Sequence, residues 1–376
     1  MDFNIQRDDL LRALTRVQGI VEKRSPVPIL TCVLVQATPE GVRFTATDKS
    51  MTFLGDFQAV VQAPGEIAID AAHFFSVARV LPEPTVRIRG VDAGRIEVKS
   101  GSSVFKLASL SASDFPVTPP IDQSRTLRLQ AGHLRKLITQ TLFSVAPDDN
   151  RYGLCGAHVE DVPTVGEGGV STPMLRMVST DGSRLSWSQV PYEGELAVSR
   201  RTLLPRKALA EMLKLLEGAD EVVELSFGDR AALLRMVGSQ LHMRLLEADF
   251  PDYRQVLPAS WKRRLLVHRD DFGEALRRVA IFATDKSRSV RFAFGADSIV
   301  LTTSEADVGD AREEYRTELQ GEPISIGFNA RYVQDVLAAC PDGRVIFELG
   351  DALAPCILKC QDDPDALFVV MPIRLD

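Results

Sequence analysis

Few side chains in this sequence have the type and spacing needed to bind a metal. Cys356-x₃-Cys360 and Cys155-x₂-His158 each have the spacing of half a zinc site. Neither has a second pair of ligands at a suitable spacing, so we expect no metal. The chain has five cysteines, an odd number, and they are widely spaced. This pattern does not indicate a disulfide framework. Cys32, Cys155 and Cys356 lie in strand-like stretches, where a free cysteine behaves as a small apolar residue.

Adjacent carboxylates form the second group with possible chemistry, because two of them can hold a divalent cation. Such pairs occur at Asp8-Asp9, Asp148-Asp149, Asp270-Asp271 and Asp362-Asp363. A helix is expected directly after Asp8 and Asp270, and carboxylates favour helix N-termini, so we interpret these two pairs as N-caps. Asp148-Asp149 continues into asparagine, which is typical of an exposed loop.

The sequence motifs of common enzymes are absent. The chain has no Gly-x₄-Gly-Lys phosphate loop, no Gly-x-Gly-x-x-Gly and no Gly-x-Ser-x-Gly. Its five histidines include no His-x₃-His pair. We therefore predict no catalytic residues, no cofactor and no enzymatic activity.

Two segments are better suited to recognition than to catalysis. Thr180-Asp181-Gly182-Ser183-Arg184-Leu185 follows a strand-like stretch, and its aspartate and glycine are typical of a turn. The segment Met371-Pro372-Ile373 cannot continue a central strand, because proline has no backbone donor. Methionine adapts to varied apolar partners, so this stretch is a candidate lining for a groove.

A strand-and-helix pattern that would position these segments occurs three times. The three copies are Phe3-x-Ile5-x₄-Leu10-x₃-Leu14, Leu127-x-Leu129-x₄-Leu134-x₃-Ile138 and Leu265-x-Val267-x₄-Phe272-x₃-Leu276. Each copy continues with strands, a second helix near 71–81, 205–216 or 329–339, and further short strands. The separation of the copies is domain-sized, far beyond the ~20–50 residues of a solenoid repeat.

Bulk properties are those of an ordinary globular protein. Hydrophobic residues make up 45% and charged residues 25% of the 376, and the net charge is −7. Basic residues nevertheless fall on the predicted helices, so one face can be basic while the whole is acidic. No apolar run approaches the ~20 residues of a membrane span, and residues 1–7 do not form a signal peptide. We expect a cytoplasmic protein with no membrane partner.

Six motifs follow one another along the chain, namely Pro26-Val27-Pro28-Ile29-Leu30, Thr45-Ala46-Thr47-Asp48, Thr180-Asp181-Gly182-x-Arg184-Leu185, Phe250-Pro251-Asp252-Tyr253-x-x-Val256-Leu257-Pro258, Gly327-Phe328-Asn329-x-x-Tyr332 and Val369-Val370-Met371-Pro372-Ile373-Arg374-Leu375. Together and in this order they resemble the bacterial DNA polymerase III beta subunit, the sliding clamp, and the likeness extends from residue 1 to residue 376.

The resemblance implies an α+β clamp fold. Three similar domains, each with two helices and antiparallel sheets, would span residues 1–125, 126–262 and 263–376. Two chains would form a head-to-tail homodimer, a six-domain ring around duplex DNA, contacted without regard to base sequence. The implied partners are the replicative polymerase alpha subunit, the clamp loader and other proteins with a clamp-binding motif.

The resemblance also implies site residues. The peptide pocket would use Leu154, Thr180, Gly182, Arg184, Leu185, Pro251, Val256, Asn329, Tyr332, Val369, Val370, Met371, Pro372, Ile373 and Arg374. The DNA contacts would be Arg24, Tyr152, Arg206 and Lys207. The dimer interface would pair Phe105 and Leu107 of one chain with Ile281 and Phe282 of the other.

Some positions depart from the family pattern. Ser183 replaces a common histidine, Gln255 a common basic residue and Pro355 a small polar residue. Gly153 and Asp148 replace an aromatic and a polar residue near the DNA contact, and Asp376 lengthens the tail by one. These departures concern details of the pocket and of the DNA contact.

Two alternatives stay open. An enzyme on a three-domain α+β scaffold would need a nucleophile or metal cluster, which the sequence does not display. A scaffold that binds peptides but not DNA would differ from a clamp in a gel shift with nicked circular DNA and a clamp loader.

Overall fold

The computed structural model repeats one arrangement of elements six times along the chain. Each repeat begins with a strand, continues with a helix and ends with three or four strands. The structure describes residues 1–22, 24–92, 94–117, 125–147, 152–165, 171–196, 198–199, 201–283, 289–305 and 309–375.

The first two repeats fill the first third of the chain. They contain β1 (Asp2–Gln6), α1 (Arg7–Gln18), η1 (Pro28–Thr31), β2 (Cys32–Thr38), β3 (Gly41–Thr47), β4 (Met51–Phe57), β5 (Ala59–Ala63), β6 (Gly65–Asp70), α2 (Ala71–Val80), β7 (Thr85–Asp92), β8 (Arg95–Ser100), β9 (Ser103–Leu110) and η2 (Ala112–Asp114).

The third and fourth repeats fill the middle third. They contain β10 (Thr126–Gln130), α3 (Ala131–Thr141), η3 (Leu142–Ser144), η4 (Tyr152–Leu154), β11 (Gly156–Val165), β12 (Ser171–Thr180), β13 (Arg184–Pro191), β14 (Glu193–Gly194), β15 (Leu203–Pro205), α4 (Arg206–Leu215), β16 (Val222–Phe227), β17 (Ala231–Met236), β18 (Ser239–Arg244) and η5 (Tyr253–Val256).

The last two repeats complete the chain. They contain β19 (Arg263–His268), α5 (Arg269–Val279), η6 (Ala280–Phe282), β20 (Ser289–Phe294), β21 (Ser298–Glu305), β22 (Gly309–Arg316), β23 (Leu319–Gln320), β24 (Ile324–Asn329), α6 (Ala330–Ala339), β25 (Arg344–Leu349), β26 (Cys356–Cys360) and β27 (Asp363–Val370).

The strands form three antiparallel sheets in two compact units. Unit 1 comprises Met1–Gly132, Glu193–Ala197 and Lys207–Leu245, and unit 2 comprises His133–Tyr192, Val198–Arg206 and Leu246–Asp376. Unit 1 contains a 14-stranded sheet in which β18 pairs with β4. Unit 2 contains a 9-stranded sheet, in which β13 pairs with β27, and a 4-stranded sheet of β20–β22 and β24. The two units therefore divide the middle third, and boundaries near 125 and 262 stay a prediction.

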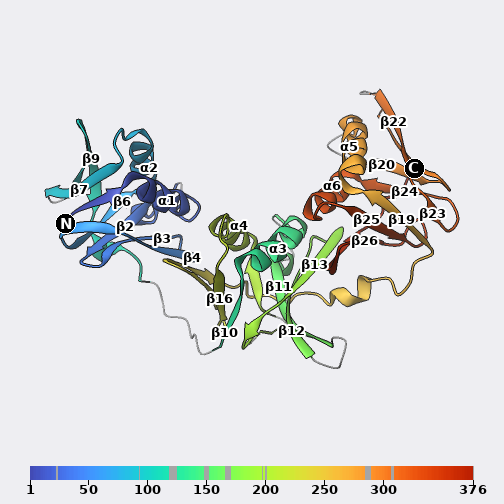
Figure 1. Ribbon diagram of the computed structural model, residues 1–376, viewed down its shortest axis with the longest axis horizontal. Helices are drawn as coiled ribbons and strands as arrows, with labels where there is room; N and C mark the ends of the chain where they lie inside the picture. The colour runs from blue at the N-terminus through green and yellow to red at the C-terminus, as the bar shows by residue number, and fades with distance from the viewer. Residues whose placement is uncertain are drawn as a thin grey trace. The chain divides into compact units, whose positions relative to one another are not determined.

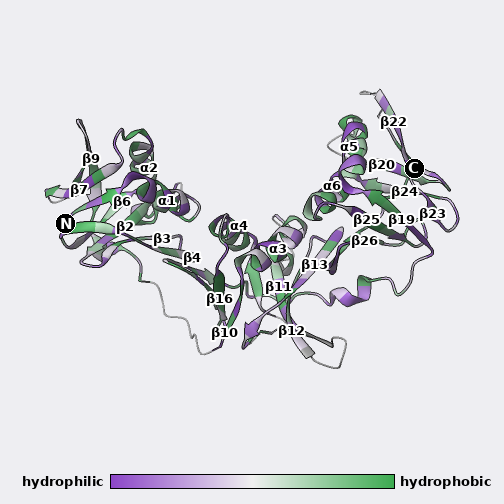
Figure 2. Cartoon of the chain, in the orientation of Figure 1, coloured by the Kyte–Doolittle hydropathy of each residue, from purple (hydrophilic) through white to green (hydrophobic). Residues whose placement is uncertain are grey.

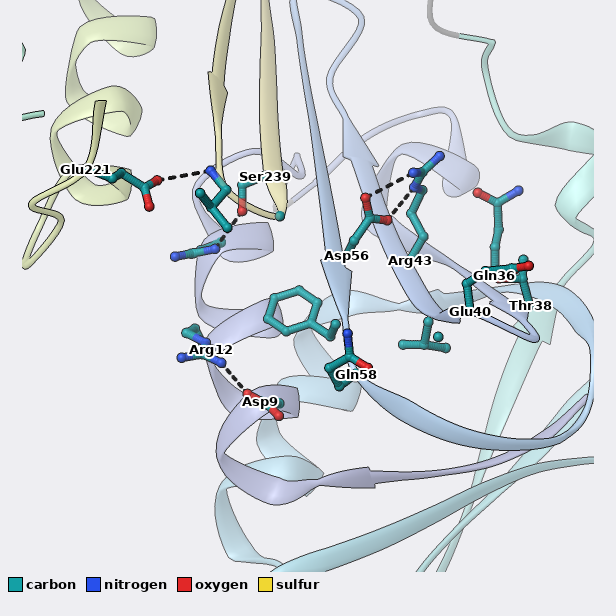
Figure 3. A pocket seen from close by; sticks show the side chains of 16 residues that line it. Asp9, Arg12, Gln36, Thr38, Glu40, Arg43, Asp56, Gln58, Glu221 and Ser239 are labelled. Carbon is teal, nitrogen blue, oxygen red and sulfur yellow. Dashed lines mark hydrogen bonds and ion pairs between the residues drawn. The ribbon is translucent and has the colours of Figure 1, made fainter. Parts of the chain in front are cut away.

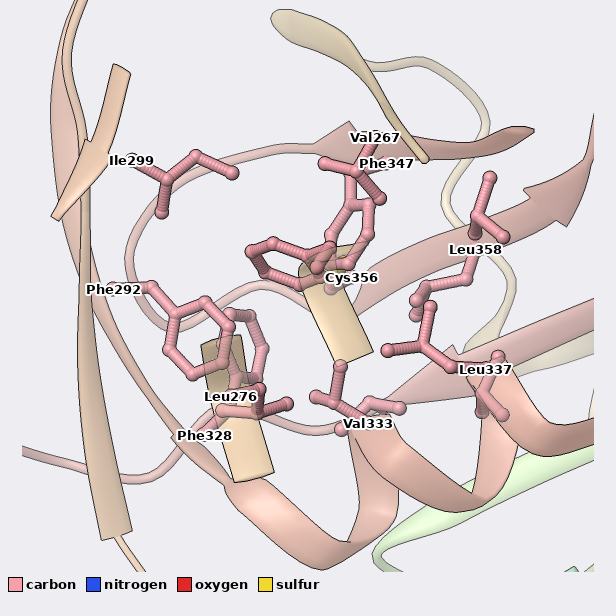
Figure 4. Close-up of a cluster of buried hydrophobic side chains, with 14 of the residues drawn as sticks. Val267, Leu276, Phe292, Ile299, Phe328, Val333, Leu337, Phe347, Cys356 and Leu358 are labelled. Atoms are coloured by element: carbon pink, nitrogen blue, oxygen red, sulfur yellow. The ribbon is translucent and has the colours of Figure 1, made fainter. Parts of the chain in front are cut away.

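The recurring pattern of the sequence is confirmed as the core of each third. All twelve of its apolar positions have at most 4% of their surface exposed. In α5, Phe272 and Leu276 face inward one helical turn apart, as the 3.6-residue period requires. Phe272 contacts Phe292 and Phe347, with ring centres 6.2 and 5.6 Å apart, in a core that α6 also covers (Figure 4). Figure 2 shows helices with both hydrophobic and hydrophilic residues, as an amphipathic helix requires.

The predicted N-caps at Asp8 and Asp270 are wrong. The N-cap residues of α1 and α5 are Gln6 and His268, and neither side chain makes a capping hydrogen bond. The aspartates lie in the first turn, where their charge still favours the positive end of the helix dipole. True side-chain caps occur at α2, where Asp70 accepts from the His73 N–H, and at α6. Figure 1 shows α5 and α6 beside the strands of unit 2.

One disulfide was not expected from the sequence. Cys340, at the C-cap of α6, is bonded to Cys360, at the end of β26, with their Cα atoms 5.9 Å apart. Cys360 thus belongs to this bond rather than to half a zinc site. Cys32 and Cys356 are free and buried at the starts of β2 and β26, and Cys155, which is not in a disulfide, precedes β11.

Within the described ranges, no helix is long and apolar enough to cross a membrane. Within the same ranges, no three His, Cys, Asp or Glu side chains are grouped in a way that could hold a metal ion.

Candidate peptide pocket and nucleic-acid contacts

The predicted Thr180–Arg184 turn joins β12 to β13 and is held by its own side chains. Asp181 Oδ1 accepts from the N–H groups of Ser183 and Arg184, at 2.9 and 3.0 Å. Thr180 Oγ1 donates to the Arg184 carbonyl at 2.6 Å and accepts from the Gly182 N–H at 3.1 Å. Gly182 has a φ of 88°, a conformation that favours glycine. The turn is therefore rigid without help from a ligand.

Arg184 connects this turn to two other elements. Its guanidinium donates to Asp181 Oδ2 at 2.9 Å, to Asp335 Oδ2 of α6 at 2.6 Å and to the Phe143 carbonyl of η3 at 2.6 Å. Its flat face lies 4.4 Å from the centre of the Tyr332 ring. Because these contacts occupy the guanidinium, Arg184 organises the site rather than offering a free charge.

Beside the turn lies a small apolar pocket of about 190 Å³. Nine predicted residues line it, namely Leu154, Thr180, Gly182, Arg184, Leu185, Pro251, Val256, Val369 and Met371. Asp252 and Tyr253 also line it and were not predicted. We call Leu185 and Val369, which are paired across β13 and β27, the pocket floor, and Pro251–Val256 the pocket wall. A pocket of this composition suits one or two apolar side chains of a peptide.

The other six predicted positions do not line this pocket. Val370 alternates to the opposite side of β27 and is fully buried in the core, which corrects its assignment to the pocket. Asn329 caps α6 by accepting from the Arg331 N–H at 3.0 Å, and Tyr332 lies under Arg184. Pro372, Ile373 and Arg374 follow the end of β27.

The C-terminal segment leaves the sheet at Met371, as the proline predicted. The Met371 N–H donates to the Ser183 carbonyl at 2.9 Å, and the Ile373 N–H donates to the Gly327 carbonyl at 2.7 Å. The Met371 side chain keeps 36% of its surface exposed. Two backbone hydrogen bonds thus hold the segment while the methionine side chain stays available.

The departures from the family pattern occupy distinct places. Ser183 is exposed in the turn, and Gln255 Nε2 donates to Asp252 Oδ2 at 3.2 Å. Pro355 lines a separate pocket of about 340 Å³ with Leu257 and Trp261. A Cβ on Gly153 would lie 2.6 Å from the Asp249 carbonyl oxygen, so a larger residue there would require a backbone shift. Asp148 and Asp376 lie outside the described residues.

The predicted DNA-contact residues do not share one environment. Arg24 is exposed and has no hydrogen bond or ion pair with another described residue. Arg206 donates to the carbonyls of Leu142 and Val145, and burial together with repulsion from Arg184 lowers its pKa. Its guanidinium therefore holds η3. Tyr152 begins η4, but its side chain lies outside the described part of the structure.

Lys207 forms an ion pair with Asp48. Burial opposes ionisation of Asp48, but hydrogen bonds from Lys207, Ser50 and the Met51 N–H outweigh it and lower the pKa of Asp48. An aspartate whose pKa is lowered in the folded state stabilises the fold at pH values above its unfolded pKa, near 3.8. This stabilisation is lost as the pH falls through the pKa of the folded state.

Arg24→Ala and Lys207→Ala should therefore differ. We expect Lys207→Ala to destabilise unit 1 by about 1 kcal/mol at neutral pH, because it leaves Asp48 without its cation, while Arg24→Ala leaves stability unchanged. Thermal melting near pH 7 checks this, and the Lys207→Ala deficit should shrink below pH 3.8. Equal melting temperatures for the two variants at pH 7 would contradict it.

The four predicted interface residues lie on β9 and in η6, which packs beside β22. Phe105 and Leu107 are half-exposed on β9, which pairs with β8 along its length and with β6 only at its end. Ile281 is 73% exposed in η6, and Phe282 packs against Gly309 at the start of β22. β22 is the edge strand of the 4-stranded sheet.

A larger and polar cavity, of about 850 Å³, lies in unit 1 (Figure 3). Its charged groups largely pair with one another, since Arg12 contacts Asp9 and Arg43 makes two hydrogen bonds to Asp56 at 2.6 and 3.0 Å. It contains none of the predicted site residues. The composition of the lining therefore favours the apolar pocket beside the Thr180–Arg184 turn as the candidate peptide site, although that pocket is the smaller of the two.

Three family models match the chain. The DNA polymerase III beta subunit N-terminal domain matches residues 1–119, the central domain residues 128–252 and the C-terminal domain residues 254–374. The beta sliding clamp of Caulobacter vibrioides is 34% identical over 379 residues and that of Vibrio cholerae is 33% identical over 381 residues. Both comparisons cover 100% of this chain and 100% of the relative.

Solved structures give the same result. A Caulobacter crescentus beta sliding clamp, with polyethylene glycol at a proposed beta-motif tethering region, superimposes with a TM-score of 0.91 at 34% identity. A Bartonella birtlesii clamp bound to griselimycin superimposes with a TM-score of 0.92 at 29% identity. In both comparisons 100% of each chain is covered.

Proposed function

Since this chain belongs to the DNA polymerase III beta subunit family, the beta sliding clamps, we propose that two copies close head to tail into a ring around duplex DNA. The chain is a DNA sliding clamp, a non-catalytic processivity factor of replication. We further propose three domains, at 1–125, 126–262 and 263–376, and a cytoplasmic location.

The unpaired edges of β9 and β22 support the proposed dimer. An edge strand carries unpaired backbone groups, which favour pairing with another strand. β9 of one copy and β22 of its partner are candidates for such a pair, with Phe105 and Leu107 against Ile281 and Phe282. Lys99 and Lys106, exposed on and beside β9, would face the exposed Asp310 and Glu314 of β22, a strand that also contains Arg312 and Arg316 and whose Glu313 pairs with Arg278 of its own chain. Head-to-tail contacts form a closed ring only if the rotation that relates one copy to the next brings the chain of copies back to its start. Two copies of three domains each would satisfy this condition.

DNA would be held by topology rather than by tight contacts. Arg24 has no hydrogen bond or ion pair among the described residues, whereas Arg206 and Lys207 are committed to internal contacts. Few phosphate contacts mean weak binding that is independent of base sequence and is lost as salt rises. A closed ring would stay on DNA despite such weak contacts.

The apolar pocket of unit 2 would tether the partners. Proteins carrying a peptide with one glutamine and two neighbouring apolar residues are the proposed ligands. They include the polymerase alpha subunit and the clamp loader. A polymerase tied to the ring keeps a high effective concentration at the template, so that it synthesises processively.

Loading on circular DNA tests the ring. Protein loaded by a clamp loader onto nicked circles should stay bound in about 0.5 M salt, because only ring opening releases it. Cutting the circle once should release it, since the ring slides off an end. Gel filtration of labelled protein measures retention. A peptide-binding scaffold that ignores DNA would be retained on neither form, and equal retention on both forms would disprove topological tethering.

A further inference from the structure

The pocket wall is a loop segment that depends on the sheet beneath it. Phe250, just before the wall, and Tyr253 within it pack on β12, β13 and β27, where they join a buried cluster with Val178, Leu185 and Val369. The floor belongs to paired strands, but the wall has no strand partner. The width of the pocket therefore depends on what holds the wall in place.

A row of polar side chains crosses the same face of this sheet. Glu160 of β11 is paired in register with Arg176 of β12, and Arg176 with Gln189 of β13. Arg176 donates to Gln189 Oε1 from Nε at 3.0 Å and from Nη2 at 2.6 Å, and Gln189 Nε2 donates to Asp365 Oδ1 of β27 at 2.9 Å. The Arg176 guanidinium also lies 4.4 Å from the centre of the Trp187 ring. Four strands thus contribute one continuous hydrogen-bonded row.

Tyr253 joins the wall to this row. Its ring lines the pocket and is 4% exposed, while its hydroxyl donates to Glu160 Oε1 at 2.5 Å and accepts from Arg176 Nη1 at 3.1 Å. Arg254 Nη2, from the next residue of the wall, donates to the other Glu160 oxygen at 2.7 Å. Glu160 therefore receives two hydrogen bonds from the wall, although it does not itself line the pocket.

The environment keeps the tyrosine hydroxyl protonated. Burial and the hydrogen bond to Glu160 raise the pKa of Tyr253 above 10.0, although Arg176 opposes the shift. The hydroxyl thus remains a donor at neutral pH. Hydrogen bonds to a charged acceptor are stronger than neutral ones, so this contact is suited to fixing a position.

We propose that Glu160 and Arg176 are positioning residues of the peptide pocket, acting through Tyr253 to hold the wall at a fixed separation from the floor. This rests on the proposed function, because it assumes that the pocket receives a peptide. The consequence concerns selectivity. A fixed separation rewards an apolar anchor that fills the pocket, whereas a loose wall discriminates poorly between a large and a small side chain.

The test uses the full-length protein and two labelled peptides. Each peptide contains one glutamine and two neighbouring apolar residues, leucine and phenylalanine, and the second peptide has the leucine replaced by alanine. Tyr253→Phe keeps the buried ring and removes only the hydroxyl. Tyr315→Phe is the matched control, because Tyr315 accepts from the His268 N–H at 2.8 Å but lines no part of this pocket. Fluorescence anisotropy measures affinity, and thermal melting checks folding.

We expect Tyr253→Phe to weaken binding of the leucine peptide by about five- to tenfold and to reduce discrimination between the peptides by at least about threefold. Tyr315→Phe should change neither. A merely structural effect would lower both affinities equally and leave their ratio unchanged, which would overturn the proposal. If Tyr253→Phe does not fold, Glu160→Gln takes its place in the same measurement of the two peptide affinities, because it keeps an acceptor for Tyr253 but loses the charge. Wild-type protein that binds neither peptide would instead refute the proposed function.

Discussion

A chain that ends at Val370 should lose peptide binding by about a hundredfold or more and remain a dimer. The missing residues include Met371, which lines the pocket, and the segment that bonds to Ser183 and Gly327. The proposed dimer contacts lie on β9, η6 and β22, so they are untouched. Fluorescence anisotropy with a labelled polymerase-tail peptide measures the first effect, and light scattering measures the second. Unchanged peptide affinity would place the site elsewhere.

Met371→Ala is the graded companion of this deletion. It removes one partly exposed anchor side chain and leaves the backbone hydrogen bond to Ser183 in place. We expect a loss of about 1–2 kcal/mol in peptide binding, or about five- to thirtyfold in affinity. An effect as large as the deletion would mean that the tail backbone contributes little.

Ile281→Asp combined with Phe282→Asp should convert the dimer into monomers at micromolar concentration. Burying two carboxylates without partners in the interface costs several kcal/mol each, which exceeds what a standard interface tolerates. Light scattering should change from about twice 41.4 kDa to 41.4 kDa. Loading on circular DNA should fail in parallel.

A control separates interface effects from general ones. Val237→Asp alters another exposed apolar residue, 81% exposed between β17 and β18, which lies outside the proposed interface. It should leave the dimer intact. Ile281→Asp alone is the cleaner variant, since Phe282 also packs on Gly309 within its own chain. A double variant that remains dimeric would refute the proposed interface.

Hydrophobic periodicity was enough to predict the helices. The second helices expected near 71–81, 205–216 and 329–339 are α2, α4 and α6, within one or two residues. The same periodicity contained a signal that was overlooked. Val369 and Val370 are neighbours on one strand, so they must point to opposite faces, and only one of them can line the pocket.

Long-range charge pairing could not be read from the sequence. Arg184 bonds to Asp335, 151 residues away, and Lys207 to Asp48, 159 residues away. No local pattern specifies such partners, so basic residues on predicted helices looked free when several were not. Asp252 and Tyr253 of the pocket were also missed, although they stand between the predicted Pro251 and Val256.

The pairing of β18 with β4 and of β13 with β27 has a consequence for the autonomy of the middle third. Excised alone, residues 126–262 would present two long unpaired edges, one in each sheet, and would be prone to stick to other strands. The middle third is therefore not an independent module that could be exchanged between relatives. A graft would have to match the strand register of its neighbours at both pairings, β18 with β4 and β13 with β27.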